Sequence, residues 1–266
     1  MNTPIHDPEK LWKIKQVLFS QILDELDSHF TAMNIRYMPI KGAYLVKTGL
    51  ASKLNSRRID DIDILVEEKE FSAACRYFTD NRRVDFLHDS WAFERQFIYH
   101  SGAGKVLFEL AWLINCRERF ILESRDLFGR SIETGTFCVL PDPVDALLIH
   151  VCHTLVHIAD DWRETNFDEM HILSQAPGFS WDEFWNRART TGILAYIAFI
   201  MGEYKHRFNP ALHSPKTGVR AAMARVLFKH RMAARLSMLR RFILEIIFAR
   251  DPLKLVMNKL KAPGVS

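Results

Sequence analysis

The stretch from Arg57 to Val66 constrains the fold most. It reads Arg-Arg-Ile-Asp-Asp-Ile-Asp-Ile-Leu-Val, so two cations precede a cluster of acids that runs into apolar residues. This run is typical of a β-strand, in which residues two apart project from the same face. Asp61 and Asp63 are therefore expected to point to one side, while the isoleucines beside them pack on the other. Two converging carboxylates repel each other, and a hard cation such as Mg²⁺ between them relieves that repulsion.

An Asp-x-Asp pair by itself is common, and the ordinary interpretation is a solvated acidic loop that enters a strand. Two other segments favour a functional site. Lys41-Gly42 ends an apolar segment, and a glycine there allows backbone N–H groups to approach a phosphate while the lysine adds positive charge. Glu109 is a lone acid in the apolar run from Val106 to Trp112, where it is costly without a partner. A metal shared with the two aspartates would supply that partner.

Taken together, the segments between residues 38 and 112 resemble the polymerase-β-type minimal nucleotidyltransferase superfamily. The closest branch is the bacterial group known only as nucleotidyltransferase family proteins. The resemblance implies that Mg²⁺ or Mn²⁺ is held by three catalytic acids, Asp61, Asp63 and Glu109. It also implies that the triphosphate of an NTP such as ATP is bound by Lys41, Gly42, Ala43 and Arg57. Position 43 is Ala where many members have Ser, and position 111 is Ala where this branch is expected to have His.

The resemblance implies a transfer of a nucleoside monophosphate from the NTP to an acceptor hydroxyl, with release of pyrophosphate. Such a transfer depends mainly on positioning and on neutralisation of charge. The alternative is a catalytically weak nucleotide-binding or interaction protein, for instance in a toxin–antitoxin or surface-polysaccharide system. Label transfer from an NTP to a cell extract would distinguish the two.

The pattern of periodicity predicts an α+β fold, with a small mixed-sheet nucleotidyltransferase domain followed by an all-helical domain. We expect the first domain at residues 1–138, including an N-terminal helix, and the second at 139–266, because two prolines near residue 141 mark a change from strands to helices. The expected strands are 36–40, 61–66, 93–100 and 105–112, the last two forming an antiparallel hairpin. The expected helices are 8–33, one from Gly42, 69–80, 143–157, 167–174, 181–190, 193–206 and two after Thr217.

Three histidines, His150, His153 and His157, recur at helical spacing in the second domain. They are compatible with a metal site, but no further ligand lies at a diagnostic spacing. We favour a polar network in or beside the helical core, with Asp160, Asp161 or Asp168 as partners. The tryptophans in apolar periodic segments are expected to pack in the core rather than to stack on bases.

Composition indicates a cytoplasmic protein. The four cysteines lie far apart and form neither a zinc pattern nor a disulfide framework. The N-terminus lacks the features of a secretory signal, and no apolar run reaches the length of a transmembrane segment.

Charge is distributed unevenly along the chain. Residues 216–261 hold twelve Lys or Arg against two acids, whereas the whole chain carries +4, so the remainder is net acidic. The cations recur beside apolar residues at helical spacing, and their ordinary role is a solvated face of core-packed helices. The alternative is contact with an anionic surface, either RNA or an acidic membrane. The basic character of this segment argues against a cationic acceptor. RNA, another anionic molecule or a protein is therefore expected to accept the nucleoside monophosphate.

Overall fold

The computed structural model describes residues 7–54, 61–91, 93–101, 104–115, 121–157, 164–209 and 211–212. Arg57 and the basic segment after residue 212 lie outside these ranges. The chain forms two compact units, Met1–Ile114 with Leu122–Ile149, and Asn115–Ile121 with His150–Ser266. The division into domains after residue 138 stays a prediction.

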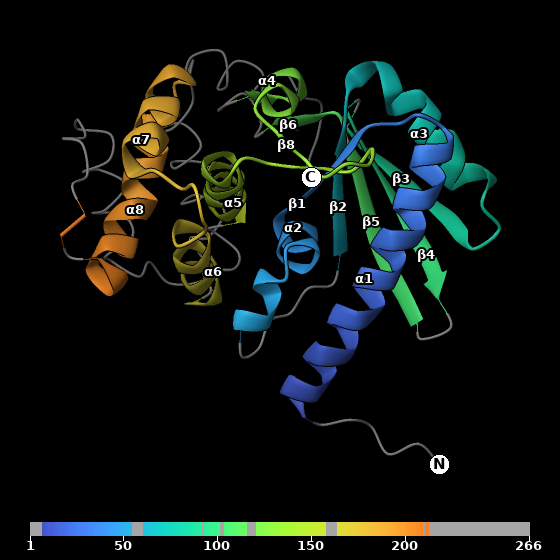
Figure 1. The fold of residues 1–266 in the computed structure, drawn as a ribbon, viewed down its shortest axis with the longest axis horizontal. Helices are drawn as coiled ribbons and strands as arrows, with labels where there is room; N and C mark the ends of the chain where they lie inside the picture. The colour runs from blue at the N-terminus through green and yellow to red at the C-terminus, as the bar shows by residue number, and fades with distance from the viewer. Residues whose placement is uncertain are drawn as a thin grey trace, which may run out of the picture. The chain divides into compact units, whose positions relative to one another are not determined.

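The first unit is built on a mixed five-stranded sheet in the order β1-β2-β5-β4-β3 (Figure 1). The β2 and β5 strands are parallel, and the other neighbours are antiparallel. The strands of this sheet are β1 (Tyr37–Ile40), β2 (Asp61–Val66), β3 (Val84–Trp91), β4 (Glu94–Ser101) and β5 (Gly104–Ala111). Two small two-stranded sheets pair β6 (Leu113–Asn115) with β7 (Ile121–Glu123) and β8 (Ile132–Glu133) with β9 (Val139–Leu140). This unit also contains the helices α1 (Pro8–Ala32), α2 (Lys41–Lys47), the 3₁₀ helix η1 (Leu50–Lys53), α3 (Glu68–Asp80) and α4 (Ser124–Gly129).

The α1 helix begins where the sequence indicates. The Asp7 carboxylate accepts hydrogen bonds from the backbone N–H groups of Glu9 and Lys10, and Pro8 occupies the first turn. Such a cap satisfies donors that have no partner inside the helix, and proline fits there because it lacks an N–H.

Aromatic side chains join α1 and α3 to one face of the sheet, along which both helices run in Figure 1. The ring of Phe30 on α1 meets Phe78 on α3 edge to face, with centroids 6.2 Å apart. Phe78 in turn stacks on Phe97 of β4 at 4.8 Å and contacts Phe108 of β5 at 5.2 Å. Residues alternate between faces along a strand, so the neighbours of Phe97 and Phe108, which are Gln96 and Glu109, project from the opposite face.

The hairpin of β4 and β5 that the sequence predicts is confirmed, whereas β3 is not among the expected strands. The pairing of β3 with β4 shifts register between Phe86 and His88 and again between Asp89 and Trp91. These irregularities break the simple alternation by which a strand is recognised. β3 is also an edge strand, on which Phe86 and Leu87 are exposed, so its burial pattern is weak.

The described part of the second unit is mainly helical, as predicted. Its helices are the later turns of α5 (Pro143–His157), then α6 (Glu164–Ser174), α7 (Trp181–Thr190) and α8 (Leu194–Phe208). Tyr204 on α8 lies in their core, where its hydroxyl is 2.9 Å from Ser174 Oγ and its ring is 5.8 Å from that of Trp181. Trp185 is buried, which agrees with a packing role. Among the helices that the structure describes, none combines the length and apolar character needed to cross a bilayer.

Candidate metal centre

Three acids meet on the sheet face opposite the aromatic layer. Asp61 and Asp63 lie on β2, and the parallel register pairs Asp63 with Glu109 of β5. Residues paired in this way share a face, so Glu109 joins the side on which both aspartates lie. One carboxylate oxygen from each acid lies within 4.8 Å of the other two. The expected convergence of the three acids is confirmed, whereas their catalytic role stays a prediction.

The positively charged ammonium group of Lys41 lies beside these acids. It follows β1, whose last residue, Ile40, is the register partner of Asp63. The Lys41 ammonium donates to Asp63 Oδ1 at 2.5 Å and to Glu109 Oε2 at 3.4 Å. The Lys41 backbone adopts a left-handed φ of 51°, which costs a residue with a β-carbon roughly 1–2 kcal/mol. A conformation of this kind persists only when surrounding contacts hold it, and the two carboxylates are such contacts.

Gln96 is a further member of the cluster. In the antiparallel register of β4 and β5 it lies opposite Glu109, and its side-chain amide donates to Glu109 Oε1 at 2.7 Å. One Glu109 oxygen thus faces Gln96 and the other faces Lys41. Sequence reasoning missed Gln96, although counting back from the predicted turn at residues 101–104 pairs position 96 with position 109.

Burial and neighbouring charges shift the pKa values of the two central acids. Burial raises the pKa of Asp63 well above its usual range; the charge of Lys41 opposes this rise, whereas Asp61 and Glu109 add to it. Burial would also raise the pKa of Glu109, but the charge of Lys41 and hydrogen bonds from Asp63, Lys41 and Gln96 lower it overall. The two pKa values are therefore shifted in opposite directions, upward for Asp63 and downward for Glu109.

The same charges keep Lys41 protonated. Burial alone would lower the pKa of its ammonium, but Asp63, Glu109 and Asp61 together raise it above its ordinary value. The cluster thus holds three carboxyl groups and the ammonium group of a side chain that is only 15% exposed.

The chemistry of these donors suits a hard divalent cation. Mg²⁺ and Mn²⁺ prefer carboxylate oxygens, and three such groups gathered around one point can supply them. Within the described residues, Asp61, Asp63 and Glu109 make up the one group of three or more potential ligands close enough together for a metal.

The other residues predicted to bind nucleotide are placed only in part. Gly42 and Ala43 lie in the first turn of α2 and are buried. Arg57 lies outside the described residues. Binding of the triphosphate by these residues stays a prediction.

His150 of α5 forms a polar pair with an acid of α6. His150 Nδ1 lies 3.4 Å from Glu169 Oε2 of α6, and both side chains are buried. His150 thus pairs with Glu169, whereas the neighbouring Asp168 is on the exposed side of the helix. The other two expected partners, Asp160 and Asp161, lie outside the described residues. The side chain of His157 is outside the described set.

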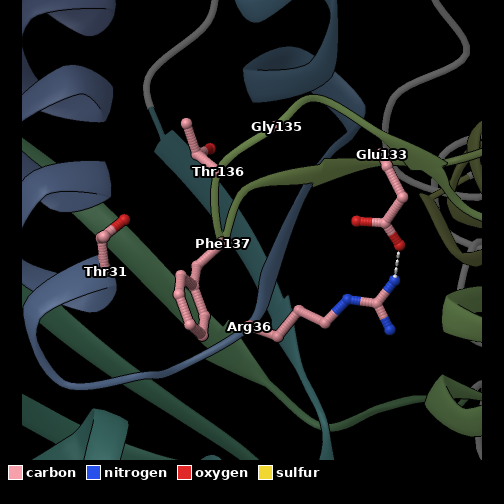
Figure 2. A pocket seen from close by; sticks show the side chains of 6 residues that line it. All are labelled: Thr31, Arg36, Glu133, Gly135, Thr136 and Phe137. Atoms are coloured by element: carbon pink, nitrogen blue, oxygen red, sulfur yellow. Dashed lines mark hydrogen bonds and ion pairs between the residues drawn. The ribbon is translucent and has the colours of Figure 1, made fainter.

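A separate cavity of about 360 Å³ opens in the first unit (Figure 2). None of the residues that line it belongs to the acid cluster: they are Thr31, Arg36, Glu133, Gly135, Thr136 and Phe137. In Figure 2 the Arg36 guanidinium reaches the Glu133 carboxylate, with which it forms an ion pair. The two charged groups of the lining therefore neutralise each other.

Comparison with known proteins shows the family of the chain. A family model described as "Uncharacterised nucleotidyltransferase" matches residues 9–209, which include the sheet, the acid cluster and the helices through α8. No curated protein and no solved structure matches the chain. The matched region covers most of the sequence, and the chain therefore belongs to this nucleotidyltransferase family.

Proposed function

We propose that the protein is a metal-dependent enzyme that transfers a nucleoside monophosphate from an NTP to an acceptor hydroxyl and releases pyrophosphate. The observation that carries the proposal is the convergence of Asp61, Asp63 and Glu109, whose oxygens lie within 4.8 Å of one another. Nucleotidyl transfer concentrates negative charge at the reacting phosphate, and a cluster of this type is suited to hold the cations that offset it.

Asp61, Asp63 and Glu109 would hold the metal, with Mg²⁺ or Mn²⁺ as the expected ion. When bound, such ions activate an acceptor hydroxyl and stabilise the departing pyrophosphate. Gln96 keeps Glu109 oriented by donating to its Oε1. Asp63 is 3% exposed, so its carboxylate works in a largely water-excluded setting where electrostatic interactions are strong.

The triphosphate, expected to be that of ATP, would be bound by Lys41, Gly42, Ala43 and Arg57. The position of Lys41 beside the acids, where it donates to Asp63, supports this role. For the acceptor we propose RNA or a protein in the cytoplasm, because the basic segment 216–261 disfavours a cationic molecule. That segment would also provide any contact with an anionic surface.

The test is label transfer. Purified protein is incubated with each α-³²P-labelled NTP, Mg²⁺ or Mn²⁺, and a cell extract that is then separated into RNA, protein and small molecules. We expect label in one fraction with the wild type, and only background with Asp63→Asn. Asp85→Asn is the matched control, since Asp85 is an exposed acid that pairs with His100 on the same sheet.

Equal labelling by the wild type and Asp63→Asn would contradict the assignment of Asp63 to the metal site. Failure of all four NTPs with both metals would contradict the proposed activity and favour a nucleotide-binding protein.

A further inference from the structure

The position of the Lys41 ammonium has a consequence for metal binding. It donates to Asp63 Oδ1 and Glu109 Oε2, two oxygens of the acids that gather around one point. A metal ion needs lone pairs of the same carboxylates, and Mg²⁺ binds them at about 2.1 Å. An ammonium and a divalent cation cannot both approach these oxygens so closely, because like charges repel strongly at short range in a buried site.

The way in which Lys41 reaches the acids supports this competition. Its side chain is 15% exposed, and the Asp63 side chain is 4% exposed, so water screens their contact little. The backbone at Lys41 holds a left-handed φ, although the adjacent residue is a glycine that would take this conformation without strain. Lys41 thus combines a left-handed backbone with side-chain contacts to two carboxylates.

We propose that Lys41 is a displaceable counter-cation of the metal centre: a divalent metal and the Lys41 ammonium compete for Asp63 and Glu109, and metal binding moves the ammonium off these carboxylates. This inference rests on the proposed metal site and goes beyond it by giving Lys41 a role before any nucleotide binds. A flexible four-carbon stem allows an ammonium to change partners within a small radius.

Release of the ammonium couples the binding of the metal to the binding of the nucleotide. Metal binding to the protein alone leaves the buried ammonium without its carboxylate partners, which is unfavourable. A triphosphate supplies new anionic partners for it, so the metal and the NTP each strengthen the binding of the other, and this coupling is reciprocal. Lys41 thereby disfavours metal binding at a site that lacks substrate.

The test measures Mn²⁺ binding to the full-length protein in the absence of nucleotide, by the electron paramagnetic resonance signal of free Mn²⁺. Lys41→Met keeps the length and apolar stem of the side chain but removes the competing charge. We expect it to bind Mn²⁺ about tenfold more tightly than the wild type, which corresponds to roughly 1.4 kcal/mol. Lys47→Met is the matched control, because it removes a cation from the same helix that pairs with Asp24 instead. The control should bind Mn²⁺ as the wild type does.

Two further measurements distinguish a change in metal binding from a folding defect of the Lys41→Met variant. Lys41→Gln retains a hydrogen-bond donor without the charge, and it should also bind Mn²⁺ more tightly than the wild type. In EDTA the Lys41→Met variant should melt below the wild type, and Mn²⁺ should raise its melting temperature by more than it raises that of the wild type.

The outcomes separate this inference from the proposed function. Equal or weaker Mn²⁺ binding by both Lys41 variants would overturn the competition and leave the metal site intact. Failure of the wild type and of both variants to bind Mn²⁺ would overturn the metal site and this inference together.

Discussion

Asp63 and Glu109 are direct partners in the parallel register of two adjacent central strands. This pairing places both carboxyl groups on one face of the sheet at neighbouring positions. A shift of one residue in the register would turn Glu109 toward the aromatic layer under α1 and α3. The apolar packing that fixes the register therefore also assembles the acid cluster.

Glu109→Gln should lower the rate of nucleotidyl transfer by at least about a hundredfold, because it removes a proposed metal ligand. Loss even of a residue that only orients such a ligand lowers metal affinity or activity roughly 10- to 100-fold. The amide keeps the shape of the side chain and can still accept from Gln96, so the fold should persist. Steady-state label transfer measures the effect, and circular dichroism checks the fold. A folded variant with the wild-type rate would show that Glu109 is not a metal ligand.

Gln96→Ala should weaken Mn²⁺ binding by roughly 10- to 100-fold, the usual cost of losing a partner that orients a ligand. The alanine removes the donor to Glu109 Oε1, one of the contacts that orient this carboxylate. Titration of Mn²⁺ against the variant measures the loss. His100→Gln is a suitable control, because His100 lies on the same strand but pairs with Asp85 at the surface. Equal losses in the two variants would indicate a general effect on β4.

The sequence could predict most of this site because it depends on local pattern. Asp61 and Asp63 share a face by strand alternation, and their strand begins and ends as the apolar run indicates. The hairpin that carries Glu109 is recognisable from its glycine-containing turn. The family resemblance of the segments between residues 38 and 112 agrees with the family model that matches the chain.

The remaining features depend on tertiary contacts that no local pattern contains. The contact of Lys41 with Asp63 requires the pairing of β1 with β2 and a left-handed residue, which the sequence at a Lys-Gly pair would assign to the glycine. The choice of Glu169 rather than Asp168 as the partner of His150 depends on the rotation of α6 in its packing. The irregular β3 carries too little alternation to be predicted.

Arg130→Met should destabilise the first unit by about 2 kcal/mol. Asp145 is 1% exposed, and Arg130 donates to both of its oxygens, at 2.8 and 3.2 Å. Breaking a buried ion pair typically costs roughly 3–5 kcal/mol, and the cost here is smaller because the Arg130 side chain is 38% exposed. Urea denaturation measures the change. Adding Asp145→Asn to this variant should recover part of the stability, and no recovery would mean that the charge of Asp145 is not what Arg130 compensates.

Tyr99→Phe tests a partly buried polar contact between the sheet and α1. The Tyr99 hydroxyl donates to Glu25 Oε2 at 2.8 Å, linking β4 to α1, and the same carboxylate pairs with Arg83. Loss of this hydrogen bond should cost about 1 kcal/mol at pH 7. The cost should depend on pH because burial, together with the hydrogen bond to Glu25 and its charge, raises the pKa of Tyr99 to about 12.

A phenol with a pKa raised above the unfolded value of 10.0 stabilises the folded state while it is protonated. The contribution of Tyr99 is thus fully present below pH 10 and is lost as the pH rises through 12. Phenylalanine does not titrate, so the difference in unfolding free energy between the wild type and Tyr99→Phe should stay constant from pH 7 to 9 and shrink above pH 10. Urea denaturation of both proteins from pH 7 to 11 measures it. A difference that remained constant across this range would show that the folded protein does not favour the protonated form of Tyr99.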